Sequence, residues 1–256
     1  MIANYHTHTP LCRHARGEIG EYAQSALENG LKILGFSDHT PYLFPQGYYS
    51  HMRMYPDQLG GYVREVLETR EAFRDRLEIH LGLEVEYYPQ YWEETLALVR
   101  DAGIEYFLLG QHWSGSEMGE PYNGYPTDRE ADLARYCSQA MDAMQTGLFT
   151  YLAHPDLIRF VVSTQTYRRH MGRLCREAKA CGMPLEINLL GLGEGRHYPD
   201  SRLWELAGEE NCPVILGVDA HSPDAFDNEE TVARALELVD RFGLDLQETV
   251  PLRSIQ

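Results

Sequence analysis

The chain has 256 residues, of which 43% are hydrophobic and 24% charged, and its formal net charge is −17 at pH 7. This composition is ordinary for a globular protein, and the negative charge argues against nucleic acid as a partner because phosphates would be repelled. No apolar run approaches the roughly 18 residues of a membrane helix, and the N-terminal MIANYHTHTP lacks the features of a signal peptide. Five scattered cysteines without a Cys-x-x-Cys pair disfavour a disulfide framework. We therefore expect a cytoplasmic protein with no membrane partner.

Short apolar segments of strand length alternate with amphipathic segments of helical periodicity along the chain. Strands are predicted at residues 1–5, 31–36, 77–83, 104–109, 148–153, 183–188 and 213–218. Helices are predicted at residues 18–28, 56–76, 90–102, 128–146, 166–181, 200–210 and 229–242. Strands and helices that alternate with short connections are typical of a parallel sheet. The sequence thus predicts an α/β barrel of seven strands, closed or nearly closed, as a single domain over residues 1–256.

Four stretches rich in Gly, Pro or Tyr are predicted to be irregular, at residues 9–17, 40–55, 113–127 and 191–197. The length of the stretch at 40–55 favours a functional lid over a simple connector. Tyrosines 48, 49, 122 and 125 lie in the two longest stretches and are candidates for lining a pocket. No element is predicted for residues 244–256.

Six of the predicted strands end at a histidine or at a neighbouring carboxylate. The carboxyl ends of parallel barrel strands share one rim, so these side chains should converge. His6 and His8 are two residues apart on an extended segment and therefore point to the same face. Asp219 and His221 repeat that spacing on the last predicted strand, which lies beside the first in a closed barrel.

The convergent side chains provide nine donors for metal ions. Nine are too many for one tetrahedral or octahedral ion, so two or three divalent cations are expected. A single strand-end histidine is more often structural, but nine donors at one rim favour a metal site. The set is His6, His8, His14, His39, Glu84, His112, His154, Asp219 and His221. Three other histidines, His51, His80 and His170, have no such position, and His80 and His170 are interpreted as structural or solvated.

This ordered set resembles the PHP (polymerase and histidinol phosphatase) family of metal-dependent phosphoesterases. The resemblance implies a distorted (β/α)7 TIM-like barrel that holds three divalent ions, of Zn, Fe or Mn. It assigns His6, His8, Glu84 and Asp219 to the first ion, Glu84, His112 and His154 to the second, and His14, His39 and His221 to the third. The choice of Glu84 over Glu86 rests on the resemblance alone. The phrase HTHTPLCRHA and the Met52-Arg53-Met54 loop look most like the monofunctional histidinol-phosphate phosphatases of the family.

Several divalent ions against two carboxylates would make a cationic site, for which a phosphate dianion is a natural guest. A water held between two ions loses its proton near neutral pH and could attack phosphorus in line. On this hypothesis Glu84 and Asp219 serve catalysis through the metals, and His197, with Asp200 as a second candidate, protonates the leaving group. Asp38 is expected to orient a ligating imidazole. The candidate phosphate clamps are Arg53, Arg159 and Arg196.

The resulting hypothesis is an enzyme, a phosphomonoesterase that converts L-histidinol phosphate to L-histidinol and phosphate in histidine biosynthesis. Its expected partner is a small phosphorylated substrate, and its oligomeric state is left open. One alternative keeps the chemistry but takes another small phosphate ester or a nucleotide. A second alternative is a non-catalytic barrel that only binds metal.

Overall fold

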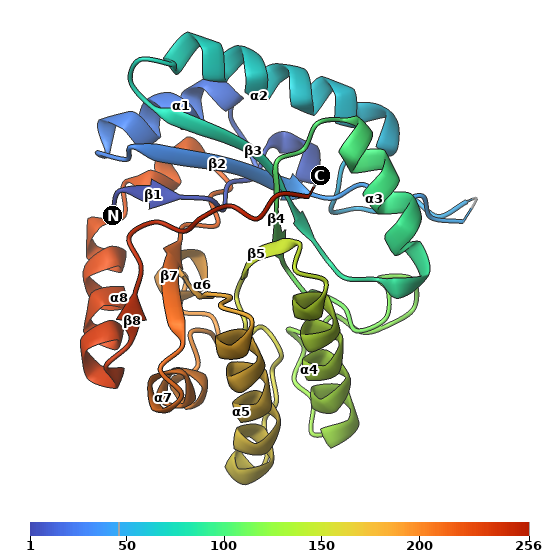
Figure 1. Ribbon diagram of the computed structural model, residues 1–256, viewed down its shortest axis with the longest axis vertical. Coiled ribbons are helices and arrows are strands. Elements are labelled where there is room, and N and C mark those ends of the chain that lie inside the picture. Colours follow the sequence, from blue (N-terminus) through green and yellow to red (C-terminus); the bar gives the residue numbers. More distant parts are fainter. Residues whose placement is uncertain (46, 256) are drawn as a thin grey trace.

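Eight parallel strands form one curled sheet in which the spatial order follows the chain, β1 to β8 (Figure 1). The computed structural model describes residues 1–45 and 47–255; Gln46, in the predicted loop 40–55, and Gln256, at the end of the tail, lie outside the described residues. The strands are β1 (Ala3–Asn4), β2 (Ile33–His39), β3 (Glu78–Val85), β4 (Tyr106–Leu109), β5 (Phe149–Leu152), β6 (Leu185–Asn188), β7 (Pro213–Gly217) and β8 (Asp245–Leu246). All seven predicted strands are present, and the α/β barrel class is confirmed.

The barrel is nearly closed by a contact between the two ends of the chain. Just beyond β1 and β7, Thr7 and Ala220 form a parallel bridge. The Ala220 N–H donates to the His6 carbonyl at 3.1 Å, and the His8 N–H donates to the Ala220 carbonyl at 2.9 Å. The expectation that the last predicted strand lies beside the first is thereby confirmed. The bridge sits between two of the predicted metal-binding segments and fixes their register.

Helices cover the outer face of the sheet (Figure 1). They are α1 (Ile19–Glu28), α2 (Leu59–Phe73), α3 (Trp92–Asp101), α4 (Glu130–Gln145), α5 (Thr164–Ala180), α6 (Leu189–Gly193), α7 (Ser201–Glu209) and α8 (Glu229–Phe242). Short 3-10 turns span Pro10–Cys12, Pro56–Gln58, Pro89–Tyr91 and Pro223–Phe226. The sequence predicted no element for α6, because its glycines indicated a loop. The helix forms because the Asn188 side chain caps it, accepting from the Gly191 N–H at 2.8 Å.

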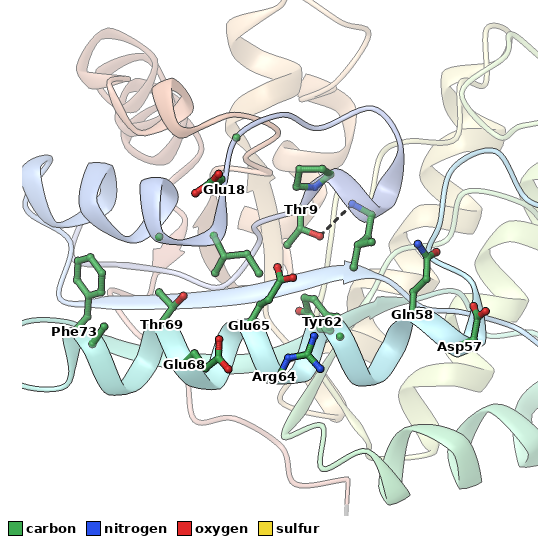
Figure 2. Close-up of a pocket in the computed structure, with 17 residues that line it drawn as sticks. Thr9, Glu18, Asp57, Gln58, Tyr62, Arg64, Glu65, Glu68, Thr69 and Phe73 are labelled. Carbon is green, nitrogen blue, oxygen red and sulfur yellow. Dashed lines mark hydrogen bonds between the residues drawn. The ribbon is translucent and has the colours of Figure 1, made fainter.

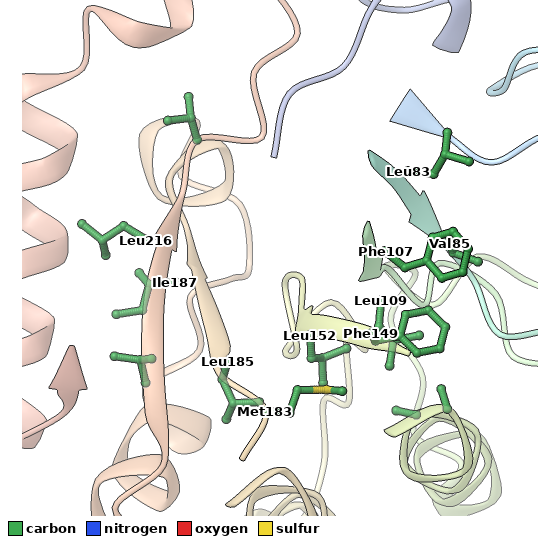
Figure 3. Packing of buried hydrophobic residues seen from close by; sticks show 14 of the residues in the cluster. Leu83, Val85, Phe107, Leu109, Phe149, Leu152, Met183, Leu185, Ile187 and Leu216 are labelled. Atoms are coloured by element: carbon green, nitrogen blue, oxygen red, sulfur yellow. The ribbon is translucent and has the colours of Figure 1, made fainter. Parts of the chain in front are cut away.

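Two apolar cores lie on the two sides of the sheet, because successive strand residues point to opposite faces. On β4, Phe107 and Leu109 point outward into a large core shared with the helices, where Leu109 lies near Phe149 and Leu152 (Figure 3). Tyr106 and Leu108 point inward into a small core inside the barrel. The inner core fills the barrel below the polar rim, so water is excluded from beneath the strand ends.

The C-terminal tail closes the barrel at the end opposite the predicted site. No element was predicted for it, yet β8 pairs with β7, and the following residues cross the end of the sheet (Figure 1). Val250 packs into the inner core beside Tyr5, and the Arg253 N–H donates to the Thr150 hydroxyl at 3.2 Å. The Ile255 side chain is fully buried. The tail therefore acts as a plug of the barrel floor.

A groove of about 960 Å³ runs outside the barrel between α1 and α2 (Figure 2). Glu18, Glu65 and Glu68 lie along it together with Arg64, and its described lining includes no histidine. The groove therefore lacks the donors that the strand ends were predicted to bring together. Across the described residues, we find no helix with the length and apolar character needed to cross a membrane.

Tight packing at Gly82 gives a first prediction. A Cβ at this position on β3 would overlap the ring of Tyr106, whose hydroxyl donates to the Tyr5 carbonyl at 2.7 Å inside the barrel. We expect Gly82→Ala to lower the free energy of unfolding by about 1–3 kcal/mol, measured by urea titration. Gly60→Ala is the control, because a Cβ there meets no atom within 4 Å in α2, and it should raise stability by about 0.5–1 kcal/mol. Equal stability of the Gly82 variant and the wild type would contradict this packing.

Candidate metal centre

A pocket of about 350 Å³ lies at the carboxyl ends of the strands and gathers the predicted donors. His6 does not line the pocket but lies directly behind it, with Nε2 3.2 Å from Nε2 of His8. The eight other predicted donors line it: His8, His14, His39, Glu84, His112, His154, Asp219 and His221. The structure therefore brings all nine into one site, from segments that span most of the chain.

Glu84, at the end of β3, lies at the centre of the site with its side chain almost fully buried. One carboxylate oxygen, Oε1, lies 2.9 Å from Nε2 of His154 and 3.6 Å from Nε2 of His112. The other, Oε2, lies 3.0 Å from Nδ1 of His39 and within 3.6 Å of Nε2 of His6 and His8. A carboxylate whose two oxygens face different sets of imidazoles is suited to bridging two cations.

Two further groups of donors lie on either side of Glu84. Asp219 Oδ1 lies 3.4 Å from Nε2 of His6 and 3.2 Å from Nε2 of His8. His14, His39 and His221 form the second group, with ligand atoms within 4.8 Å of one another. These groups correspond to the first and third ligand sets implied by the family resemblance.

The burial and the spacing of the donor atoms suit divalent cations. Among the described residues, His39 Nδ1 and Glu84 Oε2 lie 3.0 Å apart but do not have the geometry of a hydrogen bond, and His221 Nε2 is also buried without a hydrogen-bond partner. A cation would relieve this costly state. Two imidazole ligands at the usual distance from a tetrahedral ion stand roughly 3.3 Å apart, close to the 3.2 Å between His6 and His8. Imidazole and carboxylate donors suit Zn, Fe and Mn alike.

Carboxylates and backbone carbonyls hold four of the imidazoles by their Nδ1 atoms, which leaves Nε2 of these rings for a cation. Glu186 lies 2.8 Å from Nδ1 of His6, and Glu86 lies 3.0 Å from Nδ1 of His112. Carbonyls of Cys12 and Asp219 accept in the same way from His14 at 2.7 Å and His221 at 2.9 Å. Glu186 was missed because an inward carboxylate on β6 gives no strand-end signal.

Asp38, the predicted orienter, binds mainly to the backbone. It accepts from the N–H of Thr9 at 3.1 Å and from the N–H of His39 at 2.7 Å, and the Thr9 hydroxyl also donates to it. Its Oδ1 lies 3.6 Å from Nδ1 of His8, an electrostatic contact rather than a hydrogen bond. Asp38 thus fixes the segment that carries the ligands more than any one ring.

The two central carboxylates stay ionised. Burial alone raises the pKa of Glu84, but the imidazoles of His112 and His6 and a hydrogen bond with His154 outweigh it and hold the pKa well below its usual range. Asp219 behaves alike, because His6 and His8 outweigh the effect of burial and keep its pKa low. Both are therefore anionic at neutral pH, the form that binds a metal ion.

The imidazoles divide according to their neighbours. Burial lowers the pKa of His221 to about 3 and that of His39 well below its usual value, so these rings are neutral. Burial also opposes a charge on His8, but the neighbouring carboxylates of Asp219 and Asp38 raise its pKa to about 9. A cation bound there would displace the proton of His8, so metal binding should release protons.

The backbone is strained at two of the donor residues. His154 has φ of 29° and Asp219 has φ of 54°, in the left-handed region that non-glycine residues rarely adopt. Such strain persists only where surrounding contacts enforce it, and it gathers at functional sites. The His154 N–H donates to Glu186 at 2.9 Å, and Asn188 donates to Asp219 at 3.0 Å. These buried groups hold both residues in place.

The PHP domain model matches residues 4–189, nearly three quarters of the chain. The chain belongs to the PHP family. A Deinococcus radiodurans protein named a probable histidinol-phosphatase is 30% identical over 231 residues, 87% of each chain. The Bacillus subtilis histidinol-phosphatase is 24% identical, with 84% of this chain and 92% of that one covered. The fold is similar to that of the histidinol phosphate phosphatase of Lactococcus lactis, solved with zinc, L-histidinol and phosphate (TM-score 0.74, 18% identity, 99% and 97% coverage).

The three arginines predicted as phosphate clamps lie in different surroundings within this PHP fold. Arg196 lines the pocket, where it donates to the Tyr198 hydroxyl at 2.8 Å and forms an ion pair with Glu194 at 2.7 Å. The side chain of Arg159 is exposed and lies outside the described pocket lining. Arg53 is buried, and all five of its N–H donors are used by other protein groups. A phosphate clamp does not fit that placement, because no donor remains for a ligand.

His197, the predicted proton donor, points away from the PHP pocket. Its Nε2 lies 2.8 Å from the Leu157 carbonyl, and it is not among the described lining residues. Asp200, the second candidate, caps α7 and pairs with Arg202 at 2.6 Å. The neighbour of His197, Tyr198, lines the pocket instead. The role of His197 in proton transfer stays a prediction.

Aromatic side chains form part of the pocket wall. Trp113 and Tyr122 both line it, with ring centroids 5.5 Å apart. Of the other tyrosines singled out in the sequence, Tyr48 donates to Glu117 at 3.1 Å, while Tyr49 and Tyr125 are each 65% exposed. Only Tyr122 of these four therefore reaches the described pocket.

His80 and His170, which were interpreted as structural or solvated, form ion pairs outside the pocket. His80 pairs with Glu78 at 3.0 Å, and His170 pairs with Glu130 at 3.0 Å.

Gly110, next to β4, offers a test of the metal centre that leaves every ligand unchanged. A Cβ there would overlap the Glu84 carboxylate. We expect Gly110→Ala to displace Glu84 and to lower metal content, measured by elemental analysis, by at least one ion per chain. Gly20→Ala in α1 is the matched control, because a Cβ there meets no atom within 4 Å. Full metal content in a folded Gly110 variant would show that Glu84 is not a ligand.

Proposed function

We propose that this protein is a metal-dependent phosphomonoesterase that hydrolyses L-histidinol phosphate to L-histidinol and phosphate. The observation that carries the proposal is the convergence of seven imidazoles and two carboxylates on one pocket beside Arg196. The names of the D. radiodurans and B. subtilis relatives support the substrate. The L. lactis protein of similar fold was solved with zinc, L-histidinol and phosphate, which agrees with a small phosphorylated substrate and a metal cofactor.

The pocket suits a small ester rather than a polymer. Its volume of about 350 Å³ is at the lower end of small-molecule sites. Glu194 lies at its edge and could attract an ammonium group, and the faces of Trp113 and Tyr122 could contact a flat imidazole ring. Substrate charge would thus be matched by Glu194, and its ring by two aromatic side chains that lie next to the donor His112.

Three divalent ions would be held by the ligand sets named above, with Glu84 shared between two of them. When bound, they would neutralise the phosphate and lower the pKa of water to supply a nucleophile near neutral pH. The chain's own groups would do the rest. Glu186 and Glu86 orient two of the ligating rings, and the Arg196 guanidinium would donate to a phosphate oxygen. His197 is retained as the proposed proton donor to the departing alkoxide, and this would require it to turn from the Leu157 carbonyl.

The fold, the cysteines and the net charge support further proposals about the domain organisation, location and partners of the enzyme. The continuous sheet from β1 to β8 supports a single domain over residues 1–256. All five cysteines are free, as is usual in a reducing compartment, and this supports the cytoplasm as the location. The net charge of −17 supports a small substrate over nucleic acid.

Substrate and metal dependence can be tested together. We expect protein loaded in turn with Zn, Fe or Mn to release phosphate from L-histidinol phosphate at least 10-fold faster than from nucleotides or simple phosphate esters. Chelation should abolish this activity, and adding the metal back should restore it. His8→Ala should remove most of the activity because the first ion would lose one of its four ligands. Faster hydrolysis of another ester would identify that ester as the substrate. Metal binding without any hydrolysis would favour a non-catalytic barrel.

The pocket position of Arg196 leads to a comparison of variants. Loss of a charged hydrogen bond to phosphate costs about 1.5–3 kcal/mol, so Arg196→Met should lower kcat/KM roughly 10–100-fold. Arg159→Met, at an exposed arginine outside the described lining, should have a smaller effect. His197→Ala should lower kcat more than it raises KM if the ring donates a proton. Steady-state kinetics on L-histidinol phosphate measures all three, and equal kcat/KM for Arg196→Met and wild type would remove Arg196 from the site.

A further inference from the structure

Arg53 is fully buried although it lies in the long loop at residues 40–55. Its guanidinium forms a two-bond fork with Glu86, in which both N···O distances are 3.0 Å. It also donates through Nε to Glu117 at 2.8 Å, through Nη2 to the same carboxylate, and through Nη1 to the Thr40 carbonyl at 3.0 Å. The Tyr42 ring lies against the cation, 5.0 Å from its centre. The arginine is therefore fixed from every side.

The Glu86 carboxylate of this fork also contacts a residue of the metal centre. Glu86 Oε1 accepts from Arg53 and also lies 3.0 Å from Nδ1 of His112. The opposite nitrogen of that ring, Nε2, faces Glu84 at 3.6 Å. The two-bond fork with the Arg53 guanidinium is the geometry in which a carboxylate binds arginine as an anion. A charged Glu86 holds the proton of His112 on Nδ1 and leaves Nε2 as the metal-binding atom.

Glu117 connects Arg53 to the second long loop, at residues 113–127. Its side chain is 3% exposed and also accepts from the Tyr48 hydroxyl at 3.1 Å. The residues next to Arg53 and His112 in sequence, Met52 and Trp113, both line the pocket. One guanidinium thus joins the two loops beside the pocket and the ring between them.

Stability alone is a weak reason for such a cluster. Burying two carboxylates and one guanidinium carries a large desolvation cost, and apolar side chains of similar volume are often as stable or more so. Here the cluster of Arg53, Glu86 and Glu117 leaves one negative charge in excess, in contact with a predicted metal ligand. This arrangement points to a role in the site.

We propose that Arg53 is a positioning residue that sets the orientation and tautomer of His112 through Glu86 and thereby completes one metal site. On this proposal Arg53 does not touch the substrate. It acts through two hydrogen bonds, one from Arg53 to Glu86 and one between Glu86 and His112. The proposal rests on the proposed function in that His112 is taken as a metal ligand. Substitution of Arg53 should therefore weaken metal binding directly and slow hydrolysis only as a consequence.

The test measures metal binding by chelator competition, with Zn²⁺ and with Co²⁺, on the full chain. Loss of a group that orients a ligand typically weakens binding 10–100-fold, so Arg53→Met should weaken the weakest-binding ion by that factor. Arg53→Lys keeps the charge but loses the two-bond fork, so its metal affinity should lie between that of the wild type and that of Arg53→Met. Arg70→Met is the matched control: it breaks a two-bond fork with Glu105, 2.7 and 2.8 Å long, before β4 and remote from the pocket. It should leave metal affinity unchanged.

Glu86→Gln and the Arg53→Met/Glu86→Gln double variant decide whether Arg53 acts through Glu86. The double variant leaves one buried carboxylate, Glu117, without its arginine, whereas Arg53→Met leaves two, so the double variant should be the more stable of the two. If Arg53 acts through Glu86, the double variant binds metal no more weakly than Glu86→Gln alone. Additive effects, or an Arg53→Met variant that binds metal as tightly as Arg70→Met, would overturn the proposal.

The outcome for the wild type separates this inference from the proposed function. Wild-type protein that binds metal without hydrolysing L-histidinol phosphate would refute the substrate and leave the role of Arg53 to be decided by the variants. Wild-type protein that binds no metal would refute both. Active wild-type protein with unaltered metal affinity in Arg53→Met would refute only the positioning role.

Discussion

The site depends on one buried carboxylate, that of Glu84, which lies among five imidazoles drawn from four parts of the chain. Only a parallel, curled sheet can present the ends of distant strands to one point. Space for the carboxylate is provided by Gly110, where any side chain would overlap it. The fold and the site are therefore specified by the same contacts, and neither is easily altered alone.

The distribution of charge follows from this arrangement. Imidazoles supply most of the donors, so bound divalent ions would keep much of their positive charge inside a protein of net charge −17. The carboxylates that orient the rings, Glu86 and Glu186, lie one layer further from the pocket. A phosphate would meet cations and Arg196 first, while the acidic exterior disfavours longer polyanions.

Periodicity made the barrel and most of the donors predictable, because strand spacing fixes which residues reach the rim, whereas the choice of Glu84 over Glu86 came from the family resemblance. It could not reveal what lies between distant loops. Arg53 and Glu117 are 64 residues apart, and no local pattern indicates that they pair. The direction of the segment after β6 also depends on a short helix capped by Asn188, which leaves Tyr198 rather than His197 at the pocket. Glu186 would have been found only by asking which group holds the second nitrogen of His6.

The plug formed by the C-terminal tail has a consequence for the order of folding. Val250 lies against Tyr5, and their separation of 245 residues is almost the length of the chain. During synthesis the first strand cannot complete its part of the inner core until the segment that carries Val250 has left the ribosome. Contacts between residues so far apart in sequence are slow to form, so the inner core should be among the last parts of the barrel to be completed.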